Sequence, residues 1–374
     1  MKVRIMILVM LVVAAVVGVL RPKTVMAVSG ECTNCHVMHA MEGGIATQAS
    51  LKGGAAVAIA PQDFLLRNTC LGCHAGASAA PNTSTQPPKV YATSGTELAG
   101  GNFKYVDDNA DTYGHNPAEL GNADALTEPP GWKTGFPDRD NNEVGNGGAW
   151  GVNKLTCAGV WGCHGNHNAT GVKGAHHANT NGQLNAATTV GSSYRFLLGI
   201  KGYEDPDYEF TTNAATDHNV YRGEARVADT PTAAKDTISY LCAECHGIFH
   251  SGETGAPYSD GTSTDADGSF ASPWIRHPVD ISMPYTNGTA TEYDYYGTYN
   301  LTAPVATSQN ILPAAMNVTV ATDRIVMCLS CHRAHASAQP AALRWQYSNM
   351  LAGGGSNATG CFACHTAKDG TTGN

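Results

Sequence analysis

The stretch CLSCHRAH (328–335) contains the pattern that organises the rest of this chain. Two cysteines three positions apart are followed directly by a histidine, and a second histidine follows three positions later. Cys-x-x-Cys-His is the attachment signature of c-type haem. Each cysteine sulfur bonds one vinyl group of the porphyrin, and one turn of backbone brings the adjacent histidine under the iron as an axial ligand. The stretch therefore predicts a covalently held haem.

The same pattern recurs along the chain. The five copies are CTNCH (32–36), CLGCH (70–74), CAECH (242–246), CLSCH (328–332) and CFACH (361–365). A zinc site or a disulfide framework also uses paired cysteines, but neither needs a histidine directly after every second cysteine. A thioredoxin-like redox motif occurs once in a domain, not five times. Five copies in register therefore indicate a multihaem cytochrome.

A sixth site is predicted in CAGVWGCHGNH (157–167), although five residues separate its two cysteines instead of two. Cys157 and Cys163 are the only cysteines outside the five regular motifs, and Cys163 is followed directly by a histidine. Gly159 and Gly162 allow the inserted backbone to bulge away from the ring. We interpret the stretch as a working haem site with a three-residue insertion. The alternative is attachment through Cys163 alone.

The residues that would attach and bind six haems follow from these motifs. The cysteines that would form thioethers are Cys32, Cys35, Cys70, Cys73, Cys157, Cys163, Cys242, Cys245, Cys328, Cys331, Cys361 and Cys364. The histidines that would bind iron on the proximal side are His36, His74, His164, His246, His332 and His365. The expected cofactor is six covalently bound haem c groups.

Second iron ligands are available, because nine of the 15 histidines lie outside these positions. Four of them follow a motif histidine by three or four positions, namely His39, His167, His250 and His335. A histidine so close cannot reach the opposite face of its own haem, but it can reach the iron of a neighbour, so the pattern implies closely packed haems. The other five are weaker candidates, since a histidine at the surface, or one beside a ligand that does not itself bind iron, is the simpler interpretation of each. They are His115, His176, His177, His218 and His277.

The segments between the motifs predict the fold class. The motif histidines are separated by 38, 90, 82, 86 and 33 residues, which excludes a tandem repeat. The chain has 42 Gly and 18 Pro, and its long gaps are also rich in Asn and Thr. We predict mostly irregular coil wrapped around a closely packed haem chain, with short helices and few short strands. Short helices are expected at the motifs, at YRFLLGI (194–200) and at AALRWQYSNML (341–351), and an edge strand or exposed loop at YDYYGTYN (293–300).

The first 27 residues have the pattern of an export signal. Lys2 and Arg4 precede the apolar stretch 5–20, and VMA (25–27) offers small residues for cleavage. We therefore expect residues 1–27 to be a signal peptide and residues 28–374 to form a single hexahaem domain. An uncleaved membrane anchor is the alternative, although sixteen apolar residues are short for a span of about 20. Either way, the cysteines would face an oxidising compartment outside the cytoplasm.

Charge limits the partners. The net charge is −9 and no basic tract follows the N-terminus, so nucleic acid is not expected as a partner. Haem propionates would add further negative charge, which favours cationic or metal-oxide partners. The carboxylate pairs Glu204/Asp205 and Asp107/Asp108 could bind a divalent cation, but solvated loop charges are the simpler interpretation.

Several stretches resemble the OmcS-type hexahaem cytochromes, which polymerise into extracellular nanowires. They occur in the order of that family and span most of residues 28–374. The matching stretches are ECTNCHVMH (31–39), CLGCH (70–74), GHN (114–116), YRFLLG (194–199), CAECHGIFH (242–250), RHP (276–278) and CLSCHRAHAS (328–337). The stretch 157–167 departs from the family, which would have Cys-x-x-Cys-His there.

The resemblance implies a complete ligand set and an assembly. It implies distal ligands at His39, His115, His167, His250, His277 and His335, and it leaves His176, His177 and His218 as non-ligands. It also implies that His39 binds a haem of the next subunit, the one held by Cys328, Cys331 and His332, in a head-to-tail homopolymer outside the cell. The partners it implies are upstream surface or periplasmic cytochromes and extracellular electron acceptors such as metal oxides or partner cells.

The coordination expected at iron favours electron transfer. Two histidines on every iron would leave no position for a substrate. No Cys-x-x-Cys-Lys motif, which commonly marks a catalytic haem, occurs in the chain. We therefore expect an electron-transfer protein and not an enzyme. Two alternatives stay open: a non-polymeric periplasmic or surface electron shuttle, and a multihaem reductase with at least one high-spin haem.

Overall fold

The computed structural model describes about half of the chain, as separate segments. These segments are 47–48, 57–58, 70–78, 87–94, 97–109, 111–121, 126–132, 144–147, 149–168, 189–205, 207–212, 217–225, 234–250, 277, 279–283, 296, 299–309, 323–350 and 360–365. The expected signal peptide 1–27, the motif 32–36, His39, His176 and His177 lie outside them. In the segments described, no helix has the length and apolar character needed to cross a membrane.

The secondary structure is short and sparse, so the predicted fold class is confirmed. No α-helix in the described segments exceeds six residues: α2 (Cys70–His74), α3 (Lys104–Asn109), α4 (Ile238–Ala243), α5 (Gly247–His250) and α6 (Cys328–Cys331). Single 3₁₀ turns are more numerous: η3 (Asp111–Tyr113), η4 (Ala118–Leu120), η5 (Val144–Gly147), η6 (Val190–Ser192), η7 (Tyr194–Phe196), η8 (Pro340–Ala342), η9 (Tyr347–Asn349) and η10 (Gly360–Ala363).

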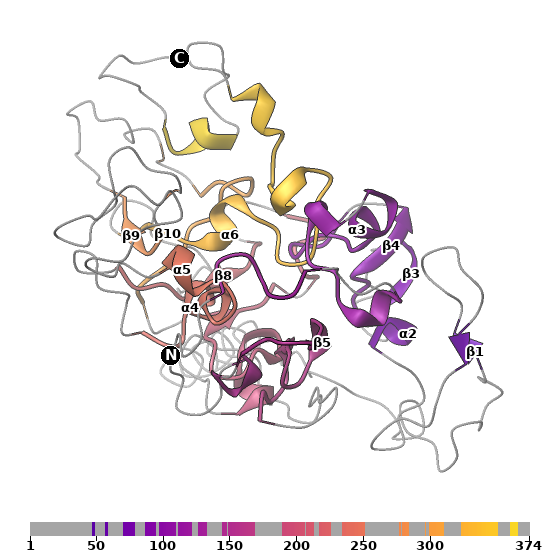
Figure 1. Ribbon diagram of the computed structural model, residues 1–374. Coiled ribbons are helices and arrows are strands. Elements are labelled where there is room, and N and C mark those ends of the chain that lie inside the picture. The colour runs from indigo at the N-terminus through magenta and orange to yellow at the C-terminus, as the bar shows by residue number, and fades with distance from the viewer. Residues whose placement is uncertain are drawn as a thin grey trace, which may run out of the picture.

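Within the described segments, the strands form only two-stranded ladders. Antiparallel pairs join β1 (Thr47–Gln48) to β2 (Val57–Ala58), β7 (Gly202–Tyr203) to β8 (Val220–Tyr221), and β9 (Ile281–Ser282) to β10 (Ile325–Val326). Parallel pairs join β3 (Ala75–Ser78) to β4 (Tyr91–Ser94), and β5 (Thr156–Ala158) to β6 (Gly162–His164). In Figure 1, α2, α3, β3 and β4 form one group, while α4, α5 and α6 gather near β9 and β10.

The expectation of short helices holds for most motifs but is wrong for the stretch 157–164. Residues 70–74, 328–331 and 360–363 form helical turns, and α4 runs into the motif 242–246. Residues 157–164 instead form the strands β5 and β6, because the inserted residues separate the two cysteines by a loop. The expected helices at 194–200 and 341–351 are reduced to the single turns η7, η8 and η9.

The insertion in 157–164 is a packed structure. Gly159 adopts φ +89°, which only glycine tolerates well, and its N–H donates to the carbonyl of His164 at 3.0 Å. Trp161 packs edge-on against Trp150 with ring centroids 4.9 Å apart, and Trp150 packs edge-on against Trp132 at 5.6 Å. The three tryptophans hold the loop in one conformation.

The apolar core is divided into separate clusters, and several of them border the haem motifs. One contains Tyr194, Leu197, Ile200, Tyr221, Ile238, Leu241, Ala306, Ile325, Met327 and Leu329, and Cys163 packs against it. A second contains Val220, Met283, Tyr296, Tyr299, Val305 and Val326 and borders Cys364, and the tryptophan cluster borders Cys245. The stretch 293–300 was expected to be an edge strand or exposed loop, but Tyr296 and Tyr299 are core residues, 1% and 5% exposed.

Candidate haem-binding sites

The cysteines of the five described motifs are chemically available. None of these ten cysteines, from Cys70 to Cys364, forms a disulfide in the described part of the chain. Thioether formation requires reduced cysteines, so the thiols fit covalent haem attachment.

The histidines of four motifs are oriented in the same way. His74 Nδ1 lies 2.8 Å from the carbonyl oxygen of Pro88, and His246 Nδ1 lies 2.7 Å from that of Pro130. Since a carbonyl only accepts hydrogen bonds, each Nδ1 must carry the proton and donate it. The other ring nitrogen, Nε2, then keeps its lone pair for iron.

The same contact at the other two motifs involves unusual backbone. His164 Nδ1 lies 2.9 Å from the Arg195 carbonyl, and His332 Nδ1 lies 2.7 Å from the Ala341 carbonyl. Arg195 and Ala341 adopt φ values of +49° and +57°, a left-handed conformation that is uncommon for residues other than glycine. The backbone is thus strained at two of the four residues whose carbonyls orient a motif histidine.

Three histidines from distant segments lie opposite motif histidines. The ring centroids of His115 and His246 are 6.1 Å apart. Two ligands on opposite sides of one metal, each bonded at about 2 Å as in zinc–imidazole bonds, would place their ring centroids about 6 Å apart. The pair His164–His335, at 6.4 Å, meets the same expectation.

The third pair lies near the C-terminus. The His277 and His365 rings are 6.0 Å apart. The separations of all three pairs fit bis-histidine binding of one iron each.

Burial keeps two of these rings neutral. It lowers the pKa of His335 to about 3, with a further contribution from His164. It also lowers the pKa of His246 to about 4, with a further contribution from His115. Iron binds neutral imidazole, so both rings are in the required protonation state at neutral pH.

The remaining candidates are placed differently. His167 is fully buried, with Nδ1 3.4 Å from a Glu244 carboxylate oxygen and Nε2 3.2 Å from the Cys163 carbonyl. If Nε2 bound iron, His167 would have to lose its contact with the Cys163 carbonyl oxygen. His250 is the last residue of α5, and only its backbone is described.

His218 was expected either at the surface or beside an iron ligand, and the structure excludes the surface position. It is fully buried and stacks on Tyr299, with ring centroids 3.8 Å apart. Its Nδ1 lies 2.7 Å from the Asn219 carbonyl. The polar sequence around His218 gives no sign of this burial.

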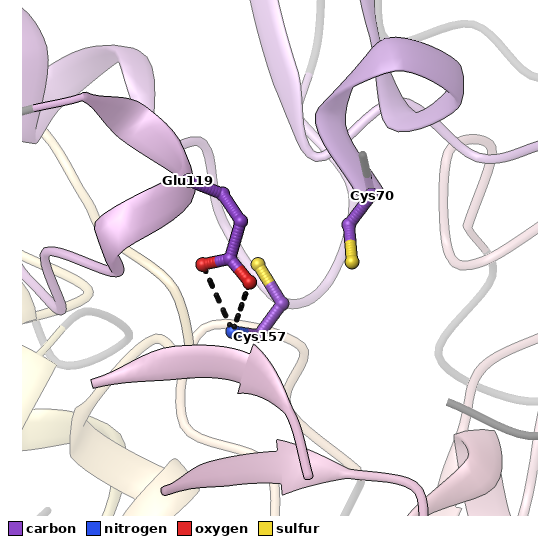
Figure 2. A group of neighbouring side chains, drawn as sticks. All are labelled: Cys70, Glu119 and Cys157. Atoms are coloured by element: carbon purple, nitrogen blue, oxygen red, sulfur yellow. Dashed lines mark hydrogen bonds between the residues drawn. The ribbon is translucent and has the colours of Figure 1, made fainter. Parts of the chain in front are cut away.

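Cysteines from different motifs lie close together, as Figure 2 shows for Cys70 and Cys157. One ligand atom each from Cys70, Cys157 and Glu119 lies within 4.8 Å of the others. Both Glu119 carboxylate oxygens accept from the Cys157 N–H, at 3.1 and 3.2 Å. The Cys70 thiol and burial raise the pKa of Cys157 well above its ordinary value. Two thiols and a carboxylate would suit zinc, but haem attachment to both cysteines would remove the thiolates.

The same contact continues along the row of motifs. The pKa of Cys242 is raised mainly by the neighbouring Cys328 thiol and by burial, and Cys163 adds to it. Burial raises the pKa of Cys331 to about 12, with further contributions from Cys364 and Cys361. Each described motif therefore lies beside the next one in chain order.

Comparisons with known proteins agree with the motifs. A family model described as a doubled CXXCH motif matches residues 319–370, which contain two of the regular copies. No curated protein matches the chain. The motifs and this match define the class: the chain is a multihaem cytochrome that binds haem c covalently.

Two solved structures are similar to the chain. One is the Outer Membrane Cytochrome S filament from Geobacter sulfurreducens, with 20% identity over 86% of this chain and 85% of that chain, and a TM-score of 0.43. The other is a cryo-EM structure of the OmcS nanowires from Geobacter sulfurreducens, with 20% identity over 85% and 84% of the two chains and the same TM-score.

Proposed function

We propose that this protein transfers electrons along an uninterrupted row of six haems that follows the chain order of their motifs. The observation that supports the proposal best is that cysteines of consecutive motifs lie near one another, from 70–74 through 157–164, 242–246 and 328–332 to 361–365. Since each haem would be bonded to these sulfurs, haems of consecutive motifs would be neighbours. Bound haem supplies the one-electron redox couple.

Each iron is proposed to have two histidine ligands. The ring separations support His335 as a ligand of the iron of His164, His115 of that of His246, and His277 of that of His365. His39, His167 and His250 are left for the irons of the other three motif histidines: His36, His74 and His332. This coordination leaves no open position for a substrate, which favours electron transfer over a reductase.

The protein would support haem binding by orienting the proximal histidines, by burying ligand rings and by packing against the attachment cysteines. The carbonyls at Nδ1 fix the tautomer and orientation of the proximal rings and raise the basicity of the ligands. Partial burial limits the access of water to rings such as His335. The separate apolar clusters support the attachment cysteines Cys163, Cys245 and Cys364 from the side.

We propose two thioethers in the site with the insertion. In the β5–β6 ladder, Thr156 pairs with Gly162 and Ala158 pairs with His164, so Cys157 lies level with Cys163. The loop of three extra residues therefore returns the two cysteines to adjacent positions.

Alkylation of the denatured holoprotein, followed by peptide mass spectrometry, tests the second thioether. We expect no alkylated Cys157 and a haem mass on the peptide that contains Cys163. A Cys157→Ser variant is the matched control, since it should keep its haem through Cys163 alone. Alkylated Cys157 in the wild-type holoprotein would rule out the second bond.

We further propose that the subunits, exported after removal of residues 1–27, polymerise head to tail outside the cell. The likeness of ECTNCHVMH (31–39) to the OmcS-type stretch supports a ligand at His39 that binds the iron of His332 in the next subunit. His332 Nδ1 is already held by the Ala341 carbonyl, so its Nε2 is free to bind iron. Upstream cytochromes would supply electrons, and metal oxides or partner cells would accept them.

The assembly is tested with a His39→Ala variant. We expect loss of filaments in electron micrographs, because an iron–ligand bond at each joint is removed, while the other five haems stay low-spin. His176→Ala is the control and should polymerise normally. If the His39→Ala protein still formed filaments, His39 would not be the ligand that joins subunits. It would then bind an iron within its own chain.

A further inference from the structure

A group of carboxylates gathers where the segment after β7 meets the segment before β8. Its members are Glu204, Asp205, Asp207, Glu209 and Asp217. The sequence favours solvated loop charges for Glu204 and Asp205, but this interpretation is wrong for Asp205, whose side chain is 0% exposed. The fold therefore removes one carboxylate of this group from water.

Asp205 has one satisfied oxygen and one unsatisfied oxygen. Oδ2 accepts the backbone N–H groups of Asp207 and Glu209, at 3.2 and 3.0 Å. Oδ1 is buried and has no hydrogen-bond donor within the described part of the chain. A buried carboxylate oxygen without a partner is costly, so a native structure normally supplies one.

The neighbours of Asp205 make this cost larger. The carboxyl groups of Asp207 and Asp217 lie within hydrogen-bonding reach of the Asp205 carboxyl, yet ionised carboxylates only accept. Burial, together with these two groups, raises the pKa of Asp205 to about 8. Two further acidic groups thus lie against one buried carboxyl group.

An arginine beside this group, Arg195, binds other members of it. Arg195 Nε lies 3.1 Å from a Glu204 carboxylate oxygen, and its Nη2 donates to Asn219 Oδ1 at 3.1 Å. The carboxylate of Glu209 accepts from the Asn219 N–H at 2.7 Å. These contacts satisfy Glu204 and Glu209 but leave Asp205 Oδ1 without a positive partner.

We propose that Asp205, Asp207 and Asp217 bind a divalent cation, with Asp205 Oδ1 as the central ligand. The chemical class is that of Ca²⁺, because all the donors are oxygens and their irregular placement suits the flexible coordination of Ca²⁺ better than the strict octahedron of Mg²⁺. The ion would join the turn after β7 to the segment that leads into β8, two parts of the chain on either side of residues 213–216.

Equilibrium dialysis of the holoprotein against Ca²⁺, with bound calcium measured per haem iron by mass spectrometry, tests the site. We expect about one strongly held calcium per subunit, and Asp205→Asn and Asp217→Asn should bind it at least about tenfold more weakly, since affinity follows the number of charged ligands. Glu128→Gln removes one exposed carboxylate elsewhere and should bind calcium like the wild type. Haem propionates are the same in all four proteins, so the difference isolates the aspartates.

Thermal unfolding gives a second readout if Asp205→Asn folds poorly. The unfolding temperature of the wild type should rise with Ca²⁺ concentration, because the ion binds only the folded state, and it should respond less to Mg²⁺. Asp217→Asn should lose most of this response. Equal calcium binding by wild type and both variants would overturn the proposal. A second result would also overturn it: a wild-type unfolding temperature that does not change with Ca²⁺, together with an Asp205→Asn variant that is more stable than the wild type. That result would indicate that Asp205 and its neighbouring carboxyl groups share a proton instead of binding a metal ion.

Discussion

Replacing His335 with alanine should convert one haem of each subunit from low spin to high spin. His335 lies opposite His164 at the separation expected for two ligands of one iron. Its ring is partly buried and stacks on Phe103, with centroids 4.6 Å apart. Alanine would therefore leave one iron without its second ligand, inside a cavity of the size of an imidazole ring. Electron paramagnetic resonance and visible spectra would count the high-spin haems.

A change of spin state must be separated from general damage to the core. His218→Ala is the matched control, because His218 also stacks on an aromatic ring, that of Tyr299, and the proposed set of iron ligands does not include it. It should lose stability and keep every haem low-spin. Added imidazole should restore the low-spin spectrum of His335→Ala by filling the cavity. A variant that stays entirely low-spin would exclude His335 as a ligand.

The local chemistry of the motifs was predictable, because it depends on residues three or four positions apart. Two cysteines and a histidine in one helical turn define an attachment site whatever surrounds them, as α2 and α6 show. The coil-rich fold was also predictable, since glycine- and proline-rich segments of this length cannot form long helices.

Contacts between distant segments could not be predicted from the residues alone. His115 lies against His246, yet nothing in the sequence around His115 distinguishes it from His218, which instead packs on Tyr299. The exposure of Asp205 was misjudged for the same reason, because burial is decided by what the folded chain places over a side chain. Glu119, which holds the Cys157 backbone, was missed because no motif contains it.

Replacing Gly162 with alanine should destabilise the protein by about 3 kcal/mol, at the upper end of the usual cost of overpacking. A Cβ at this position would lie 2.5 Å from the Ala158 nitrogen and 2.6 Å from the Thr156 carbonyl oxygen. Both atoms are backbone of β5, so they cannot move aside without breaking the β5–β6 register. That register places Cys157 level with Cys163, so the variant should also lose the bond between haem and Cys157.

Two measurements check this, and a glycine beside another motif provides the control. Denaturant unfolding would report the loss of stability, and peptide mass spectrometry would report an alkylated Cys157. Gly76→Ala lies in β3, just after the motif 70–74, and its Cβ would meet only the flexible Lys89 side chain, at 3.5 Å. Its stability should stay within about 1 kcal/mol of the wild type, because the new methyl group makes an ordinary contact and also restricts the unfolded chain. If Gly162→Ala retained both thioethers and wild-type stability, the register of β5 and β6 would not be what brings the separated cysteines of this site together.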